Sequence, residues 1–334
     1  MPKSAVTSAP TGGVPIIDIG PVIAGTPNAQ PTVARQICAA LEEIGFFGIA
    51  NHGLPNGIVE RTFEASHSFF ALPLETKLKV KINSAHRGYM PMSDQHRAEA
   101  KRPNLSESFL IGLDLGPDDP DTAAGKPLHG PNQWLAEPAG FRTVMEAYHR
   151  AMTDLGFKML ELFETALEVE SGFFRRCYQK PMAFVRALHY PPAPADLPPD
   201  QFGAAPHSDF GFMTILAQDS VGGLQVRTRA GEWLDVPNLP GVFIVNVGDM
   251  LMRWTNDRFV STVHRVINAA GSDRYSLPFF FDPDFDTEVR CIPTCEGPGN
   301  PPRYEPTTWG AFVTERFDAN HAYRRAQEAN ASKR

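Results

Sequence analysis

The sequence is poor in the features that mark secreted, membrane-bound and nucleic-acid-binding proteins. Its 334 residues include only four cysteines, Cys38, Cys177, Cys291 and Cys295, which are too few and too scattered for a disulfide framework. Cys291 and Cys295 can pair or share a metal, although two incidental thiols in a late loop are the simpler interpretation. The formal net charge of -7 argues against nucleic acid or an anionic membrane as the main partner, because both select basic surfaces.

Long apolar runs are also absent. No stretch of about 18 apolar residues occurs, so no membrane span is expected. Residues 1–13 are rich in Ser, Ala, Thr, Pro and Gly, lack the apolar core of a signal peptide, and are expected to form a flexible tail. These absences make a cytoplasmic protein the default expectation. The remainder, 14–334, is expected to be one globular unit, because 42% hydrophobic and 21% charged residues are ordinary for a soluble protein with a sizeable core.

The first half of the chain alternates helical patterns with short apolar runs. Helices are predicted where apolar residues recur at steps of three and four, over 32–44, 55–70 and 141–167. Short apolar runs predict strands at 14–19, 46–50 and 106–112. Residues 87–91 break the pattern and are expected to form a loop. His52 and His67 are expected to cap or pack locally rather than to bind a metal.

From Ala183 onward the pattern changes to short strands. They are predicted at 183–190, 213–217, 223–227, 232–236, 242–247, 260–268 and 275–281. Many short strands in one block are typical of a double-sheet barrel or jelly roll. The expected fold class is therefore α+β, with a double-sheet core at 183–285 that holds the candidate metal site and is braced by the N-terminal and central helices. An N-terminal region at 14–112 and a closing helix at 314–328 complete the predicted unit.

His207, Asp209 and His264 form a candidate metal site. His207 and Asp209 are two positions apart, so on a strand both side chains lie on one face, and the strands before His264 can return the chain beside them. Two histidines and one carboxylate leave positions on the ion for substrate and O2, as in non-haem Fe(II) oxygenases. Zinc uses similar ligands, so the triad alone does not name the metal. The triad also fits a fold with a loop histidine, a turn-forming aspartate and a core histidine.

Arg274 and Ser276 form a second candidate site. The turn at 270–273 predicts a hairpin that pairs their strand with the strand of His264, and their spacing places both side chains on one face. Arginine offers a carboxylate two parallel hydrogen bonds, and the serine hydroxyl adds another. Because a buried arginine needs an anionic partner, a small dicarboxylate is expected to bind the metal at one end and Arg274 at the other. Alternatively, Arg274 is a surface turn residue.

In combination these motifs resemble those of Fe(II)/2-oxoglutarate-dependent dioxygenases, in the isopenicillin N synthase-like branch. The likeness extends along most of the chain, through Pro15-Ile16-Ile17-Asp18, Gly45-Phe46-Phe47, Asn51-His52-Gly53, Gly222-Gly223-Leu224-Gln225-Val226, Asn246-Val247-Gly248-Asp249 and His264-Arg265-Val266. The resemblance implies a double-stranded β-helix (jelly-roll) core that encloses Fe(II) and 2-oxoglutarate, with O2 as oxidant and a small molecule as substrate.

The family often carries Asn-x-Tyr just before the metal strand, in contact with 2-oxoglutarate. The corresponding positions here are Leu188 and Tyr190, so the tyrosine is kept and the asparagine is missing. Arg186 lies two positions before Leu188 on the same alternation. It is a candidate replacement for the missing contact to the cosubstrate.

Three further residues are candidates for the substrate pocket. Phe280 shares parity with Arg274 and Ser276, so it is expected to face the same cavity. Arg87 and Tyr89 lie in the predicted loop at 87–91, which can cover the mouth of that cavity. The aromatic run around Phe280 suits many small molecules and selects none.

The leading functional prediction is a 2-oxoglutarate-dependent hydroxylase or desaturase of a small molecule. One alternative is an oxidase or ring-forming enzyme of isopenicillin N synthase type, in which Arg274 and Ser276 bind the substrate's own carboxylate and 2-oxoglutarate is not used. Another is a jelly-roll protein that retains a metal but has lost turnover. Release of succinate separates the first two, and iron-dependent uptake of O2 removes the third.

Overall fold

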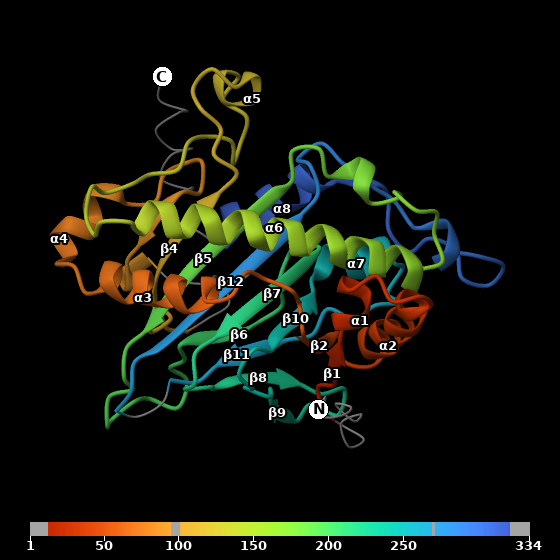
Figure 1. Ribbon diagram of the computed structural model, residues 1–334, viewed down its shortest axis with the longest axis horizontal. Helices are drawn as coiled ribbons and strands as arrows, with labels where there is room; N and C mark the ends of the chain where they lie inside the picture. The colour runs from red at the N-terminus through yellow and green to blue at the C-terminus, as the bar shows by residue number, and fades with distance from the viewer. Residues whose placement is uncertain (1–12, 95–100, 269–270, 321–334) are drawn as a thin grey trace.

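Two main β-sheets and a layer of helices dominate the part of the protein that the computed structural model describes, residues 13–94, 101–268 and 271–320 (Figure 1). The larger sheet has eight strands in the order β1-β2-β10-β7-β12-β5-β4-β3, and the smaller has four in the order β6-β11-β8-β9. β1 runs parallel to β2, and every other neighbouring pair in the two sheets is antiparallel. This double-sheet arrangement is the expected jelly roll, in an α+β protein.

The strands that build these sheets are mostly short. In chain order they are β1 (Ile16–Asp18), β2 (Phe46–Ala50), β3 (Gly88–Met90), β4 (Glu107–Gly112), β5 (Met182–Tyr190), β6 (Ala204–His207), β7 (Met213–Gln218), β8 (Leu224–Arg227), β9 (Trp233–Asp235), β10 (Phe243–Val247), β11 (His264–Val266) and β12 (Arg274–Asp282). A separate two-stranded ribbon pairs β13 (Glu288–Val289) with β14 (Thr307–Thr308).

The helices differ widely in length. They are α1 (Gly20–Ile23), α2 (Ala29–Glu43), α3 (Ile58–Phe70), α4 (Leu74–Lys77), α5 (Pro120–Ala123), α6 (Phe141–Ala166), α7 (Asp249–Trp254) and α8 (Trp309–Asn320). None of them, over the residues described, is both long and apolar enough to cross a membrane.

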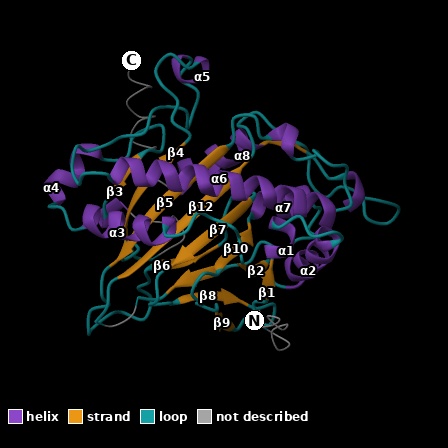
Figure 2. Cartoon of the chain, viewed as in Figure 1, coloured by secondary structure: helices purple, strands orange, loops and turns teal. Residues whose placement is uncertain are grey.

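Helix α6 crosses one face of the large sheet, and α2 and α3 pack beside it (Figure 2). The contact is close because Gly156 of α6 has no side chain: a Cβ there would lie 2.7 Å from the ring of Phe281. Phe279 points to the same side, with its ring 6.0 Å from that of His149 on α6. Residues in β12 alternate between the faces, so Phe280 points away from α6, toward the small sheet.

Most predicted elements form, with three corrections. Residues 88–90 are the buried strand β3 rather than a loop, because they pair with β4. The predicted hairpin between the strands of His264 and Arg274 is wrong: β11 lies in the small sheet, whereas β12 pairs with β5 and β7 in the large one. The closing helix begins earlier, at Trp309, and the end predicted for it lies outside the described residues, as does nearly all of the predicted N-terminal tail. The four cysteines are free thiols, so Cys291 and Cys295 form no disulfide.

Candidate metal centre and cosubstrate pocket

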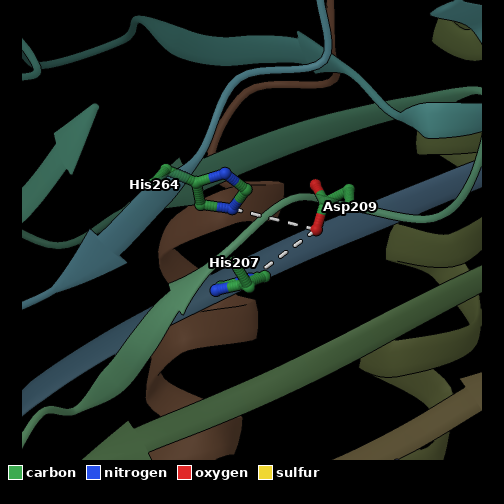
Figure 3. Close-up of side chains that lie close together, drawn as sticks. All are labelled: His207, Asp209 and His264. Carbon is green, nitrogen blue, oxygen red and sulfur yellow. Dashed lines mark ion pairs between the residues drawn. The ribbon is translucent and has the colours of Figure 1, made fainter. Parts of the chain in front are cut away.

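His207, Asp209 and His264 meet between the two sheets, as Figure 3 shows. One ligand atom from each residue lies within 4.8 Å of the others. The Nε2 atoms of His207 and His264 are each 3.8 Å from Oδ1 of Asp209, too far for a hydrogen bond. Two ligands held at about 2.0–2.2 Å from one ion can be up to ~4.4 Å apart, so these distances suit a shared metal.

Hydrogen bonds orient each of the three side chains. Nδ1 of His207 lies 2.7 Å from the carbonyl of Ala205, and Nδ1 of His264 lies 3.1 Å from the carbonyl of Thr262. A carbonyl can only accept, so each Nδ1 carries the proton and each Nε2 keeps the lone pair that a metal would need. Partners of this kind fix the tautomer and orientation of metal-binding histidines.

The carboxylate of Asp209 is oriented in the same manner. The Thr214 hydroxyl donates to its Oδ2 over 2.6 Å, and the Asn246 amide donates to the same oxygen over 2.7 Å. Both bonds fall on Oδ2, so Oδ1 is left facing the imidazoles. The sequence prediction missed both partners, although Asn246 lies in the quoted Asn246-Val247-Gly248-Asp249 motif.

Asp209 reaches the site by a route that differs from the prediction. β6 ends at His207, so Asp209 lies in the loop between β6 and β7 and does not share a strand face with His207. The first turn of α7 binds this loop: the N–H of Asp249 donates to the carbonyl of Asp209 over 2.8 Å, and the N–H of Met250 donates to that of Phe210 over 3.2 Å. These donors are the unpaired N–H groups that every helix start presents.

The second candidate site is a buried guanidinium. Arg274 is 1% exposed. Its Nε donates to the carbonyl of Gly222, and its Nη2 donates to Oε1 of Gln218 over 3.0 Å. Its third nitrogen, Nη1, has no hydrogen-bond partner. No carboxylate of the described residues pairs with it. Tyr190 lies opposite Arg274 in the strand pairing, with the guanidinium carbon 4.7 Å from its ring centre. A buried cation with an unused donor fits an anionic ligand group.

One cavity connects the triad with Arg274. Every second residue of β12 faces it, namely Arg274, Ser276, Pro278, Phe280 and Asp282, and the facing residues of β5 are Phe184, Arg186, Leu188 and Tyr190. Helix α8 adds Trp309, Val313 and Phe317 to the wall.

Arg186 is therefore in the cavity, where its Nη2 also contacts the sulfur of Met90 at 3.8 Å. Leu188 faces Ser276, so the position of the missing asparagine is filled by an apolar side chain.

Arg87 and Tyr89 do not line this cavity. The buried Arg87 donates to the carbonyls of Ala85 and Leu113 and stacks on Phe184, 4.7 Å from its ring centre. Tyr89 lies in β3, where its hydroxyl donates to Oε2 of Glu107 over 2.5 Å. The position of Tyr89 follows from the pairing of β3 with β4, which the sequence prediction did not contain.

Glu107 is the centre of a buried charged network on the helix-covered side of β4. Nζ of Lys77 donates to its Oε2 over 2.7 Å, and Nδ1 of His189 lies 2.8 Å from its Oε1. Nε2 of His189 in turn lies 2.7 Å from Oδ1 of Asp273. Burial by itself would lower the pKa of His189, but the hydrogen bonds to Glu107 and Asp273 outweigh it and raise that pKa. Each buried charge of this network thus has a partner within it.

Comparisons with known proteins decide the family. A model described as the 2OG-Fe(II) oxygenase superfamily matches residues 178–283, and one described as the N-terminal region of non-haem dioxygenases in morphine synthesis matches residues 14–137. The 2-oxoglutarate-Fe(II) type oxidoreductase hxnY of Emericella nidulans is 37% identical over 338 residues, which cover 97% of each chain. The chain belongs to the 2-oxoglutarate- and Fe(II)-dependent oxygenases. Clavatol oxidase claD of Penicillium crustosum, 37% identical over 85% of this chain and 90% of its own, is a further similar member.

Solved structures of oxygenases agree with this assignment. The full-length Neurospora crassa T7H in complex with alpha-KG and thymine aligns with a TM-score of 0.83 at 26% identity, covering 94% of this chain and 99% of that one. JOX2 in complex with 2OG, Fe and JA aligns with a TM-score of 0.77 at 26% identity, covering 97% and 91%. As an oxygenase of this family, the protein is an enzyme that uses Fe(II), 2-oxoglutarate and O2 and couples decarboxylation of 2-oxoglutarate to oxidation of a small molecule.

Proposed function

We propose that His207, Asp209 and His264 hold the Fe(II), and that Arg274, Ser276 and Tyr190 bind the far carboxylate of 2-oxoglutarate. The observation that carries this proposal is the unpartnered Nη1 of the buried Arg274, in the cavity that also contains the triad. A dicarboxylate between the two sites supplies the anion that the guanidinium lacks. When bound, iron and 2-oxoglutarate supply the oxidising power, as 2-oxoglutarate and O2 are converted to succinate and CO2 while the substrate is oxidised.

The chain's own residues position the reactants. Thr214 and Asn246 keep Oδ1 of Asp209 turned toward the two imidazoles. Tyr190, 3% exposed, covers the guanidinium of Arg274 and keeps bulk water from it, which strengthens its attraction for a carboxylate. Arg186 lines the same cavity, so its side chain can contact either the cosubstrate or the primary substrate. Arg186→Ala tests the first role, which predicts a raised KM for 2-oxoglutarate; an unchanged KM removes Arg186 from the cosubstrate site.

The primary substrate in this proposal is a small, largely apolar molecule with a flat ring. The part of the cavity away from Arg274 is lined by the aromatic side chains of Phe184, Phe210, Phe280, Trp309 and Phe317. Aromatic walls favour flat rings through stacking and edge-to-face contacts. The similar structures named above contain thymine in one case and JA in another, both of them small molecules. The reaction is hydroxylation or desaturation of this molecule.

The proposal also includes the branch of the oxygenase family and the cellular compartment of the protein. The order of motifs from Pro15 to Ser276 supports a place in the isopenicillin N synthase-like branch. Four unpaired cysteines suit a reducing compartment such as the cytoplasm.

A substrate panel tests the function directly. Candidate ring compounds are incubated with Fe(II), 2-oxoglutarate and O2, and succinate is measured against the rate without substrate, with His264→Ala as the inactive control. The proposal predicts that at least one ring compound raises succinate formation and yields an oxidised product in equal amount. Product without succinate would favour an enzyme of isopenicillin N synthase type. If no compound gives iron-dependent O2 uptake, the result would favour a jelly-roll protein that retains a metal but has lost turnover.

A further inference from the structure

Asp282 is a buried carboxylate to which neither the metal site nor the cosubstrate site gives a role. It ends strand β12 and faces the cavity from the end opposite Arg274. Only 5% of its surface is exposed, and within the described residues no basic side chain pairs with it. Burial raises its pKa to about 7, although the N–H of Phe212 and the indole of Trp309 act in the opposite direction. A buried carboxylate is costly to keep unless hydrogen bonds satisfy it.

The contacts of Asp282 fall on the metal-binding loop, residues 208–212. The backbone pairing of β12 with β7 ends at Phe281 and Met213. One residue farther, where β7 gives way to the loop, the N–H of Phe212 donates to Oδ1 of Asp282 over 2.5 Å. A side-chain oxygen thus replaces the backbone carbonyl that would continue the ladder. It extends the attachment of this chain segment one residue closer to Asp209.

Gly211 makes this contact possible. A Cβ at Gly211 would lie 2.2 Å from Oδ1 of Asp282 and 2.6 Å from its Oδ2, so any side chain there would displace the carboxylate. The other side of the loop is held by α7, through the N–H groups of Asp249 and Met250 described above. The loop is therefore fixed from two sides, by the start of α7 and by the side chain of Asp282.

We propose that Asp282 is a positioning residue: its hydrogen bond to Phe212 fixes the metal-binding loop so that Asp209 meets the two histidines. Its role differs from that of Thr214 and Asn246, which orient the carboxylate of Asp209 rather than its backbone. This inference rests on the proposed function in one respect, that Asp209 is a metal ligand. The attachment of the loop itself is independent of any metal.

Two measurements on the full chain test the proposal, with Asp282→Ala, Asp282→Asn and Gly211→Ala as variants. The first is the affinity for Mn(II), a probe that O2 does not oxidise. The second is hydrogen–deuterium exchange of the peptide covering 208–213 in metal-free protein. Asp282→Ala and Gly211→Ala are expected to weaken Mn(II) binding about 10–100-fold, the usual cost of losing an outer partner of a ligand, and to speed exchange in this peptide. Asp282→Asn, whose amide oxygen still accepts from Phe212, is expected to restore most of both.

A matched control separates positioning from general stability. Leu277 lies in the same strand, is fully buried and does not face the cavity, so Leu277→Ala lowers stability without touching the loop. The proposal is overturned if Leu277→Ala weakens Mn(II) binding as much as Asp282→Ala does, if Asp282→Asn restores nothing, or if exchange in 208–213 is unchanged. If wild-type protein and His264→Ala bind Mn(II) equally, the proposed metal site fails instead, and the exchange measurement still decides the role of Asp282.

Discussion

His207 lies directly opposite His264 in the antiparallel pairing of β6 with β11, and their ring centres are 4.3 Å apart. Directly opposed residues in neighbouring strands place their side chains on the same face of the sheet. The register of one strand pair therefore brings together two imidazoles that are far apart in the sequence. A slip by one residue would turn one ring to the other face and abolish the site.

The hydrogen bonds to Oδ2 of Asp209 are expected to matter for metal affinity. Thr214→Val and Asn246→Ala each remove one donor, which is expected to weaken metal binding about 10–100-fold, because the carboxylate is then free to rotate. Titration with Mn(II) measures the effect. Thr214→Ser keeps the hydroxyl and is expected to bind like wild type. Equal affinities for Thr214→Val and Thr214→Ser would show that this bond does not orient the ligand.

Arg274→Lys is expected to raise the KM for 2-oxoglutarate. Lysine presents a point charge and cannot reproduce the planar group that binds Gly222, Gln218 and a carboxylate at once. A lost hydrogen bond to a charged group is worth about 1.5–3 kcal/mol, or roughly 10–100-fold in KM. Succinate formed without primary substrate reports the change. An unchanged KM together with lost product formation would instead assign Arg274 to a carboxylate of the primary substrate.

Phe280 and Phe279 are neighbours in β12 that point to opposite faces, so they form a matched pair. Phe280→Ala enlarges the cavity and is expected to raise the KM for the primary substrate with little change in that for 2-oxoglutarate. Phe279→Ala empties a fully buried site under α6 and is expected to cost about 3–5 kcal/mol of stability. Steady-state kinetics and urea unfolding of both variants give the comparison. Similar effects on substrate KM would contradict the opposite placement.

His189 is expected to stabilise the fold more at low pH than at high pH. Its pKa is raised in the folded protein, so its contribution is fully present below about pH 6.5, the ordinary pKa of histidine, and is lost as the pH rises through the raised value. His189→Gln is expected to cost about 1.5–3 kcal/mol at pH 6, since it weakens hydrogen bonds to two carboxylates. Unfolding in urea at pH 6 and pH 9 measures the difference between variant and wild type. A difference that stays constant or grows with pH would contradict a protonated His189.

Residues whose role depends on sequence spacing could be predicted from the chain. The alternation in β12 correctly placed Phe280 in one cavity with Arg274 and Ser276, and the runs at 46–50 and 106–112 correctly indicated β2 and β4. The convergence of His207, Asp209 and His264 was also correct, although one reason given for it was not: Asp209 lies in a loop beyond the end of β6. The spacing of the motif residues thus predicted correctly that the three side chains converge, whereas the strand geometry assumed for Asp209 was wrong.

Features that depend on which strands pair could not be read from the sequence. β12 begins only a few residues after β11 ends, as hairpin strands do, yet the two join different sheets, because β12 inserts between β5 and β7. The short segment at 88–90 is a strand only because β4 lies beside it. Thr214, Asn246 and Asp282 are ordinary polar residues in sequence, and their roles emerge only when β7, β10 and β12 are aligned around Asp209.

The central claim is that one metal ion and one 2-oxoglutarate share the cavity between the triad and Arg274. Anaerobic calorimetric titration of 2-oxoglutarate into the protein, with and without Fe(II), tests it most directly and needs no knowledge of the primary substrate. We predict one 2-oxoglutarate per chain whose binding tightens when Fe(II) is present, with the Fe(II) effect lost in Asp209→Ala and the binding itself weakened in Arg274→Lys. Binding that is indifferent to Fe(II), or unchanged in both variants, would contradict the account.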